Sequence, residues 1–248
     1  MADINSLTMI AKRDLGPTYF DEPSWHRALR AVEVGLRHGI DPATVAKLGT
    51  VAIRRDATVS WAKEIYEMVS DIHLAYPMVS AELALKIIEV AFKVGTHPYW
   101  LANVIAFESG FKTDKPNPIS GAVGLIQFMP KVAAKLFGMV PEITIRGRGQ
   151  IYSESQKAEA SSRVAAMSAF EQLDLVKKYL DPFVGRLIDQ SAIYMSVFYP
   201  AAMLWPPTRE FPGNVAEMNP GISTPGDYVR MAVKRAKLPH SLRLPVLT

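Results

Sequence analysis

The chain has 248 residues, 49% hydrophobic and 21% charged, which is typical of a globular protein rather than a disordered one. It contains no cysteine, which excludes disulfide bonds and thiolate metal sites. The formal net charge of +4 fits an ordinary mildly basic surface, with attraction to an anionic polymer as the alternative; the basic residues are too dispersed for a nucleic-acid partner, and we expect none.

Helical patterns follow one another along the chain. Apolar spacing and capping residues predict helices over residues 25–38, from 41 onward, and over 60–75, 80–95, 96–110, 168–181 and 187–204. Gly95 and Gly110 are typical helix ends, and Ser168 with Glu171 forms a capping box. The best strand candidate is 142–146, and the mixed polarity of 147–162 predicts a loop. The fold class is therefore mostly α.

The N-terminal part of the chain repeats a pattern found later. Residues 25–49 align with 81–105 at a constant offset of 56, and seven aligned positions are identical. Two helical hairpins that obey the same capping rules would explain this, and so would a duplicated hairpin. The position that corresponds to Glu108 is Ala52, which has no acid function. We therefore expect residues 1–78 to form a helical extension without a site of its own.

Glu108 lies at the end of an apolar helix face. Helical spacing places Leu101, Val104 and Ile105 on its side of the helix, one or two turns back. Such surroundings disfavour the carboxylate anion, so we expect its pKa to be raised, as a general acid requires. Taken alone, a glutamate at the end of a helix would more often point into water.

The segment after Glu108 is rich in turn signals. Gly110 permits a sharp turn, and Gly121 and Gly124 permit close approach of the backbone to another object. Gln127 offers an amide, and the Phe128-Met129 pair that follows offers apolar surface. This mixture suits a sugar with N-acetyl groups, and an ordinary glycine-rich connector is the alternative.

These residues form a longer signature. Glu108-Ser109-Gly110-Phe111 and, further on, SGAVGLIQFMP from Ser120 to Pro130 resemble the signature of the soluble lytic transglycosylase family. The helix that begins at Ser168 is similar to one that crosses behind the cleft of that family. The resemblance implies a lysozyme-like catalytic domain at 79–205, preceded by the extension at 1–78 and followed by a C-terminal extension, 206–248, packed on the catalytic domain.

The resemblance also implies a reaction. Glu108 would act as catalytic acid and base, cleaving the β-1,4 bond between N-acetylmuramic acid and N-acetylglucosamine in peptidoglycan with formation of a 1,6-anhydro ring. The enzyme would need one carboxylate and no cofactor; Asp114 as a second catalytic acid is the less favoured alternative. The implied substrate-binding residues are Ser109, Ser120, Gly124, Leu125, Gln127, Phe128, Met129 and Tyr179.

A tyrosine that steadies the glutamate belongs to the same family pattern. The family has an Ala-Tyr-Asn-x-Gly element late in the domain, whereas this chain has Phe198-Tyr199-Pro200-Ala201. Tyr199 fits the tyrosine position, although Pro200 replaces the asparagine. We therefore expect Tyr199 to be the second catalytic residue, with a core tyrosine as the alternative.

The cellular context is inferred from what the sequence lacks. We see no secretory signal, no apolar run of the roughly 20 residues that a membrane span needs, and no histidine pattern for a catalytic metal. A phage protein would fit, either a virion component in the tail or interior or an endolysin held in the host cytoplasm before lysis, and acting on the periplasmic wall. The alternatives are a structural tail, baseplate or internal virion protein that retains the fold and contacts other phage proteins, and a hydrolase of the goose-type lysozyme kind.

Overall fold

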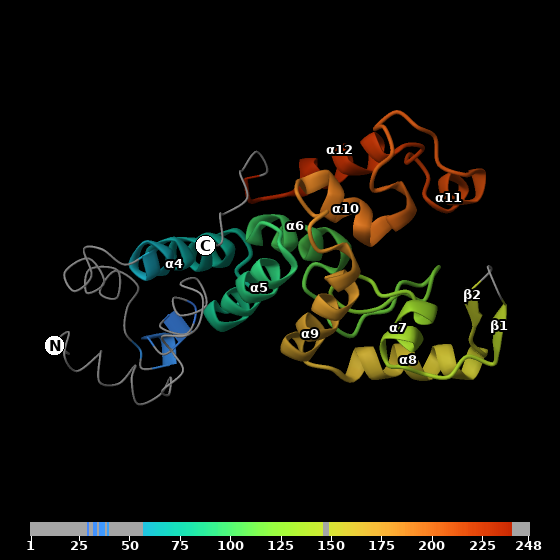
Figure 1. Cartoon of the computed structure of the whole chain (residues 1–248), viewed down its shortest axis with the longest axis horizontal. Coiled ribbons are helices and arrows are strands. Elements are labelled where there is room, and N and C mark those ends of the chain that lie inside the picture. Colours follow the sequence, from blue (N-terminus) through green and yellow to red (C-terminus); the bar gives the residue numbers. More distant parts are fainter. Residues whose placement is uncertain are drawn as a thin grey trace. The chain divides into compact units, whose positions relative to one another are not determined.

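The computed structural model describes residues 57–145 and 149–239, together with positions 29, 32, 33, 35–37 and 39. The described chain is mostly helical and contains one two-stranded sheet (Figure 1). Two compact units are present, one of residues 1–89 with 245–248 and one of residues 90–244. No helix among the described residues combines the length and the apolarity needed to cross a membrane.

The first unit contains helix α4, Ala57–Ala75, and the start of helix α5, Ala81–Val94. Both helices match predicted ones, and the described positions between 29 and 37 are helical as predicted. Apolar residues at helical spacing on α4, including Ile65, Val69 and Ile72, are buried. The rest of the predicted helix at 25–38, the helix predicted from 41 and most of the first repeat copy lie outside the described residues.

Helix α6, Pro98–Ser109, belongs to the second unit. Burial lowers the pKa of His97 to about 4, so its ring is neutral and Nδ1 accepts a hydrogen bond from the Tyr99 amide at 3.2 Å, which caps the helix. Gly110 ends the helix with a φ of 61°, in the left-handed region that favours glycine. The predicted start and end of this helix are confirmed.

The segment after the glycine-rich loop contains a short helix, a hairpin and a longer helix. These are α7, Pro130–Leu136, strands β1, Ile143–Ile145, and β2, Gly149–Ile151, and α8, Glu154–Ala166. The strand predicted at 142–146 is confirmed, and its Ile143 pairs with Ile151. The loop predicted at 147–162 is wrong, because β2 and most of α8 occupy it. Ser153 and Gln156 form a capping box for α8. The helix buries only Ala160 and Val164, so its sequence shows only a weak apolar pattern.

Helices α9, Ala169–Leu180, and α10, Gln190–Phe198, follow. The capping box of Ser168 and Glu171 on α9 is confirmed. Helix α10 is shorter than the predicted 187–204. The Asp189 side chain caps its start, and Pro200, which cannot continue the helical hydrogen bonds, follows its end. A single 3-10 turn, Pro200–Ala202, comes next.

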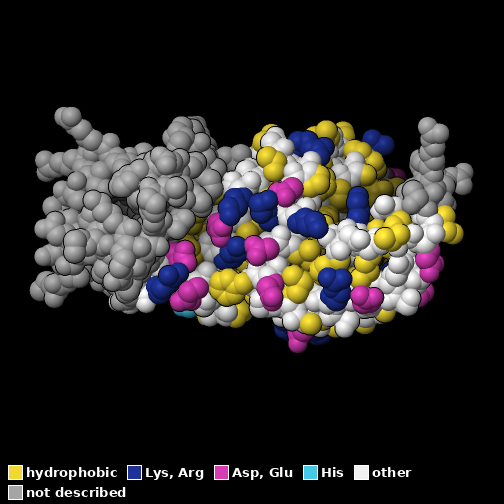
Figure 2. Space-filling view, turned by 60° about the horizontal axis from the view of Figure 1, so that its bottom comes forward, with side chains coloured by type: hydrophobic (Ala, Val, Ile, Leu, Met, Phe, Trp, Pro, Cys, Tyr) yellow, Lys and Arg dark blue, Asp and Glu magenta, His cyan; other side chains and the backbone are white. Residues whose placement is uncertain are grey.

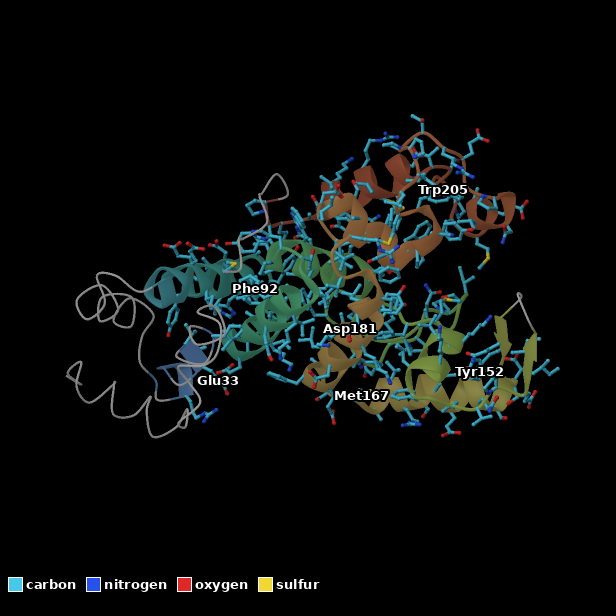
Figure 3. All side chains as sticks on the ribbon, viewed as in Figure 1. Glu33, Phe92, Tyr152, Met167, Asp181 and Trp205 are labelled. Atoms are coloured by element: carbon cyan, nitrogen blue, oxygen red, sulfur yellow. The ribbon has the colours of Figure 1, made fainter. Side chains whose placement is uncertain are left out.

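The unit ends with helices α11, Gly213–Met218, and α12, Pro225–Arg235. Within the unit, α6, α10 and α12 contact one another, and α7 contacts both α8 and α9 (Figure 1). Trp205 lies on the side formed by α10, α11 and α12, and Tyr152 lies beside the hairpin (Figure 3). Residues 206–239 belong to the same unit as the preceding helices, and α12 contacts both α6 and α10.

Candidate active site

Glu108 lies in the last turn of α6, where the helix has left the core. Leu101, Val104 and Ile105 on the same helix are fully buried, and Glu108 itself is half-buried. Burial raises the pKa of Glu108 from its ordinary value of 4.5 to about 7, and a hydrogen bond from Tyr228 opposes this rise. A carboxyl with this pKa is substantially protonated near neutral pH, so it can both donate and accept a proton there.

Tyr228, on α12, donates its hydroxyl hydrogen bond to Oε1 of Glu108. Only 2% of this tyrosine is exposed. Burial and the charge of Glu108 raise the pKa of Tyr228 well above 10, so the phenol stays neutral and remains a donor. The bond joins residues 120 positions apart in the sequence and occupies one of the two carboxyl oxygens.

Aromatic rings surround Tyr228 on three sides. Phe198 stacks on it, with the ring centroids 4.1 Å apart and the planes 15° from parallel. Phe107 and Tyr194 meet it edge-on, at centroid distances of 5.4 Å and 6.2 Å. This packing holds the ring of Tyr228 in one place on the side of α12 that meets α6.

Tyr199, which the sequence suggested as the partner of Glu108, lies on the far side of Phe198 and Phe211 in the same run of aromatic contacts. Its ring contacts Trp205 and Phe211, at centroid distances of 5.9 Å and 5.6 Å. The partner hydroxyl comes instead from Tyr228, which corrects the expectation. The reason is that Tyr199 follows the last residue of α10 with an extended φ of −149°, whereas Tyr228 lies on α12, a helix in contact with α6.

Sequence reasoning missed Tyr228 because the resemblance to the family signature ends before it, at about residue 205. The sequence does contain a pattern that predicts this helix, because Thr224 and Asp227 can form a capping box. Tyr228 and Ala232 then lie one turn apart on the apolar face of the helix. Which residue that face would contact depends on the tertiary fold.

Ser109 ties the glycine-rich loop to helix α6. Its Oγ donates a hydrogen bond to the Leu125 carbonyl oxygen at 2.9 Å and also lies 3.2 Å from the Ile105 carbonyl oxygen. Its hydroxyl is therefore used inside the protein, and its contribution to the site is to hold the loop beside Glu108.

Gln172, on α9, organises the same loop from behind. This side chain is fully buried; its Oε1 accepts the Leu125 amide at 2.9 Å, and its Nε2 donates to the carbonyl oxygens of Val164 and Thr113 at 2.8 Å and 2.9 Å. The backbone at Gly124 lies so close to the Gln172 side chain that a Cβ added to Gly124 would be 2.7 Å from Gln172 Oε1. Glycine is needed there for this approach and for the φ of 86°.

The remaining loop residues divide between surface and core. Met129 is 44% exposed and Gln127 is half-buried, with its amide donating to the Gly124 carbonyl oxygen at 3.2 Å. The side chains of Leu125 and Phe128 are buried, so of the pair expected to offer apolar surface only Met129 does so; the implied substrate-binding role of Leu125 and Phe128 stays a prediction. Their burial follows from the tight turn between Val123 and Phe128, which pair as an isolated bridge and turn these side chains inward.

Ser120 and Tyr179 support the site from two sides. Ser120 accepts the Ala122 amide on Oγ at 3.3 Å, within the loop. Tyr179 donates its hydroxyl to the Ser196 carbonyl oxygen at 2.6 Å, and Phe128 meets its ring edge-on at 6.1 Å. Burial, and after it the charge of Glu108, raises the pKa of Tyr179 to about 12, which places this tyrosine within electrostatic reach of the site.

The charged surface does not single out another site. The face drawn in Figure 2 carries basic and acidic side chains interspersed over the described part of the chain. Within 57–145 and 149–239, no three or more His, Asp or Glu side chains are grouped so that they could hold a metal ion. Asp114, the acid nearest to Glu108 in the following loop, is exposed.

Comparisons of this chain with protein-family models, with curated proteins and with solved structures found no match. The site itself therefore carries the functional argument: a desolvated carboxyl at a helix end, a neutral tyrosine donor bonded to one of its oxygens, and a glycine-rich loop fastened beside it.

Proposed function

We propose that this chain is a peptidoglycan lytic transglycosylase, with a lysozyme-like catalytic unit and Glu108 as its single acid and base. The observation that carries the proposal is the raised pKa of Glu108, about 7, in a carboxyl hydrogen-bonded by Tyr228. The resemblance of the loop from Ser120 to Pro130 to the family signature supports the choice of substrate.

The proposed reaction uses the two oxygens of Glu108 differently. Tyr228 holds Oε1, which leaves Oε2 to carry the proton to the glycosidic oxygen. The bond between C1 of the muramic sugar and that oxygen breaks, and the N-acetylglucosamine side leaves with a hydroxyl. The 6-hydroxyl oxygen of the muramic sugar then bonds to C1, and the Glu108 carboxylate accepts its proton. The acid is thereby restored, and no water is consumed.

The acids near the site favour a mechanism with one carboxylate. Glycosidases with two catalytic carboxyls place them roughly 5–9.5 Å apart across the bond that is cleaved. Asp114 is exposed in its loop, and Asp227 caps α12 and pairs with Arg230 at 2.5 Å. Neither has the buried surroundings of Glu108. An internal hydroxyl of the substrate, which needs no second enzyme carboxyl, is the nucleophile that fits such a site.

The test is digestion of purified peptidoglycan followed by mass spectrometry of the fragments. Fragments that end in 1,6-anhydro-N-acetylmuramic acid would support the proposal, and loss of these fragments with Glu108→Gln would assign the acid. Reducing ends would indicate a hydrolase, and intact glycan strands would reject enzymatic cleavage. Asp114→Asn is the matched control, expected to cleave like the natural chain.

A further inference from the structure

Asn103 is a polar residue on the buried face of the catalytic helix. It is 1% exposed, and its neighbours on α6, Leu101, Val104 and Ile105, are fully buried and apolar. Its Nδ2 donates to the Leu238 carbonyl oxygen at 3.1 Å, and its Oδ1 accepts the Leu238 amide at 3.3 Å. One side chain thus pairs with both backbone groups of a residue 135 positions away.

The pairing of Asn103 with Leu238 is the second of two contacts between α6 and the segment that contains α12. The first joins Tyr228, early in α12, to Glu108, late in α6. The second joins Leu238, three residues beyond α12, to Asn103, five residues before Glu108. The order is therefore antiparallel: the chain that brings Tyr228 to the carboxyl continues back along the catalytic helix and is bonded there.

The start of α12 is held by a separate contact. The Gly226 amide donates to the Pro207 carbonyl oxygen at 2.9 Å, and a Cβ on Gly226 would lie 2.8 Å from that oxygen. This contact and the aromatic packing of Tyr228 both act on the first turns of α12, so they leave the orientation of its far end on α6 to other contacts. The pairing of Asn103 with Leu238, at the far end, fixes that orientation.

We propose that Asn103 is a positioning residue for Glu108: by pairing with Leu238 it fixes α12 on α6 in the orientation that brings the Tyr228 hydroxyl to the carboxyl. An aliphatic residue would fill the same buried place without polar groups to desolvate. The pairing of an amide with one particular backbone residue selects a single register of the two segments, as buried polar residues do between coiled-coil helices. The catalytic meaning of this inference rests on the proposed function.

The effect of Asn103 on the position of Tyr228 can be measured through the pKa of Glu108. The titratable groups that act on or around this carboxyl are Tyr228 from α12, Tyr179 from α9 and Tyr194 from α10. Of these, Tyr228 donates a hydrogen bond to the carboxyl, which lowers its pKa. Loss of alignment between Tyr228 and Glu108 therefore raises the pKa of Glu108, whereas a general loss of stability in the folded chain does not.

The experiment is an NMR titration of the Glu108 carboxyl carbon in the full chain, in four forms: natural, Asn103→Leu, Tyr228→Phe and the double variant. A hydrogen bond to a charged group corresponds to roughly one to two pKa units, so Tyr228→Phe should raise the pKa by about that amount. Asn103→Leu should raise it in the same direction, and the double variant should not exceed Tyr228→Phe alone. Gln156→Ala, which removes the half-buried hydrogen bond from the Ser153 amide to the Gln156 side chain at the start of α8, should leave the pKa unchanged.

An unchanged pKa in Asn103→Leu, or shifts that add in the double variant, would overturn the inference. Should Asn103→Leu fail to fold, amide exchange in the natural chain decides: the Leu238 amide must be protected, and rapid exchange would reject the pairing. The titration needs no substrate, so a chain that fails to cleave peptidoglycan would reject the proposed function and leave this result to be judged separately.

Discussion

Replacing Glu108 with glutamine should change the stability of the protein in a way that depends on pH. The substitution keeps the size of the side chain and an oxygen that can accept the Tyr228 hydrogen bond, but it removes the titrating group. The pKa of this carboxyl is raised from 4.5 to about 7 by burial. The folded state therefore keeps its proton at pH values where the unfolded state has lost it.

The sign of the effect follows from proton uptake. A carboxyl whose pKa is higher in the folded state makes folding less favourable as pH rises from about 4.5 through 7, and the penalty is then constant. Each pKa unit corresponds to about 1.4 kcal/mol, so the raised pKa of Glu108 costs the folded state about 3 kcal/mol at pH 8, against about 1 kcal/mol at pH 5. Glu108→Gln avoids this cost.

Urea unfolding at pH 5 and pH 8 measures the difference. The variant should gain stability over the natural chain on going from pH 5 to pH 8, by about 2 kcal/mol. Over the same range, Asp114→Asn, at an exposed carboxyl, should change by less than about 0.5 kcal/mol. A gap between Glu108→Gln and the natural chain that stays constant across this range would show that the carboxyl is solvated, and the general-acid argument would fail.

Four further substitutions test the site. Tyr228→Phe should lower glycan cleavage about tenfold or more, because a hydrogen bond to the reacting carboxyl is lost, whereas Tyr199→Phe should stay within about twofold; equal effects in kinetic assays would contradict the assignment of Tyr228. Gly124→Ala should lower the free energy of unfolding by about 2–4 kcal/mol, through its clash and its positive φ, and an unchanged urea midpoint would refute the close approach. Ser109→Ala should cost about 1 kcal/mol in the same assay through the lost bond to Leu125, and full stability would show that this bond does not hold the loop.

The helices of the second unit were largely predictable because their end signals are local. His97-Pro98 and Gly110 delimit α6, and Ser168 with Glu171 starts α9, whatever the rest of the chain does. The segment 147–162 was not predictable as strand and helix. Strand β2 is only three residues long and forms by pairing with β1. Helix α8 buries little of its surface, so the apolar pattern in its sequence is weak.

By itself the sequence determined where helix α6 ends and that a glutamate with apolar neighbours stands there, because capping and helical spacing act over a few residues. The tertiary structure alone decided that Tyr228 rather than Tyr199 meets Glu108, and that Gln172 holds the glycine-rich loop. Those contacts join residues 47 and 120 positions apart. No local rule ranks one distant tyrosine above another, because the choice depends on which helices contact one another in the folded chain.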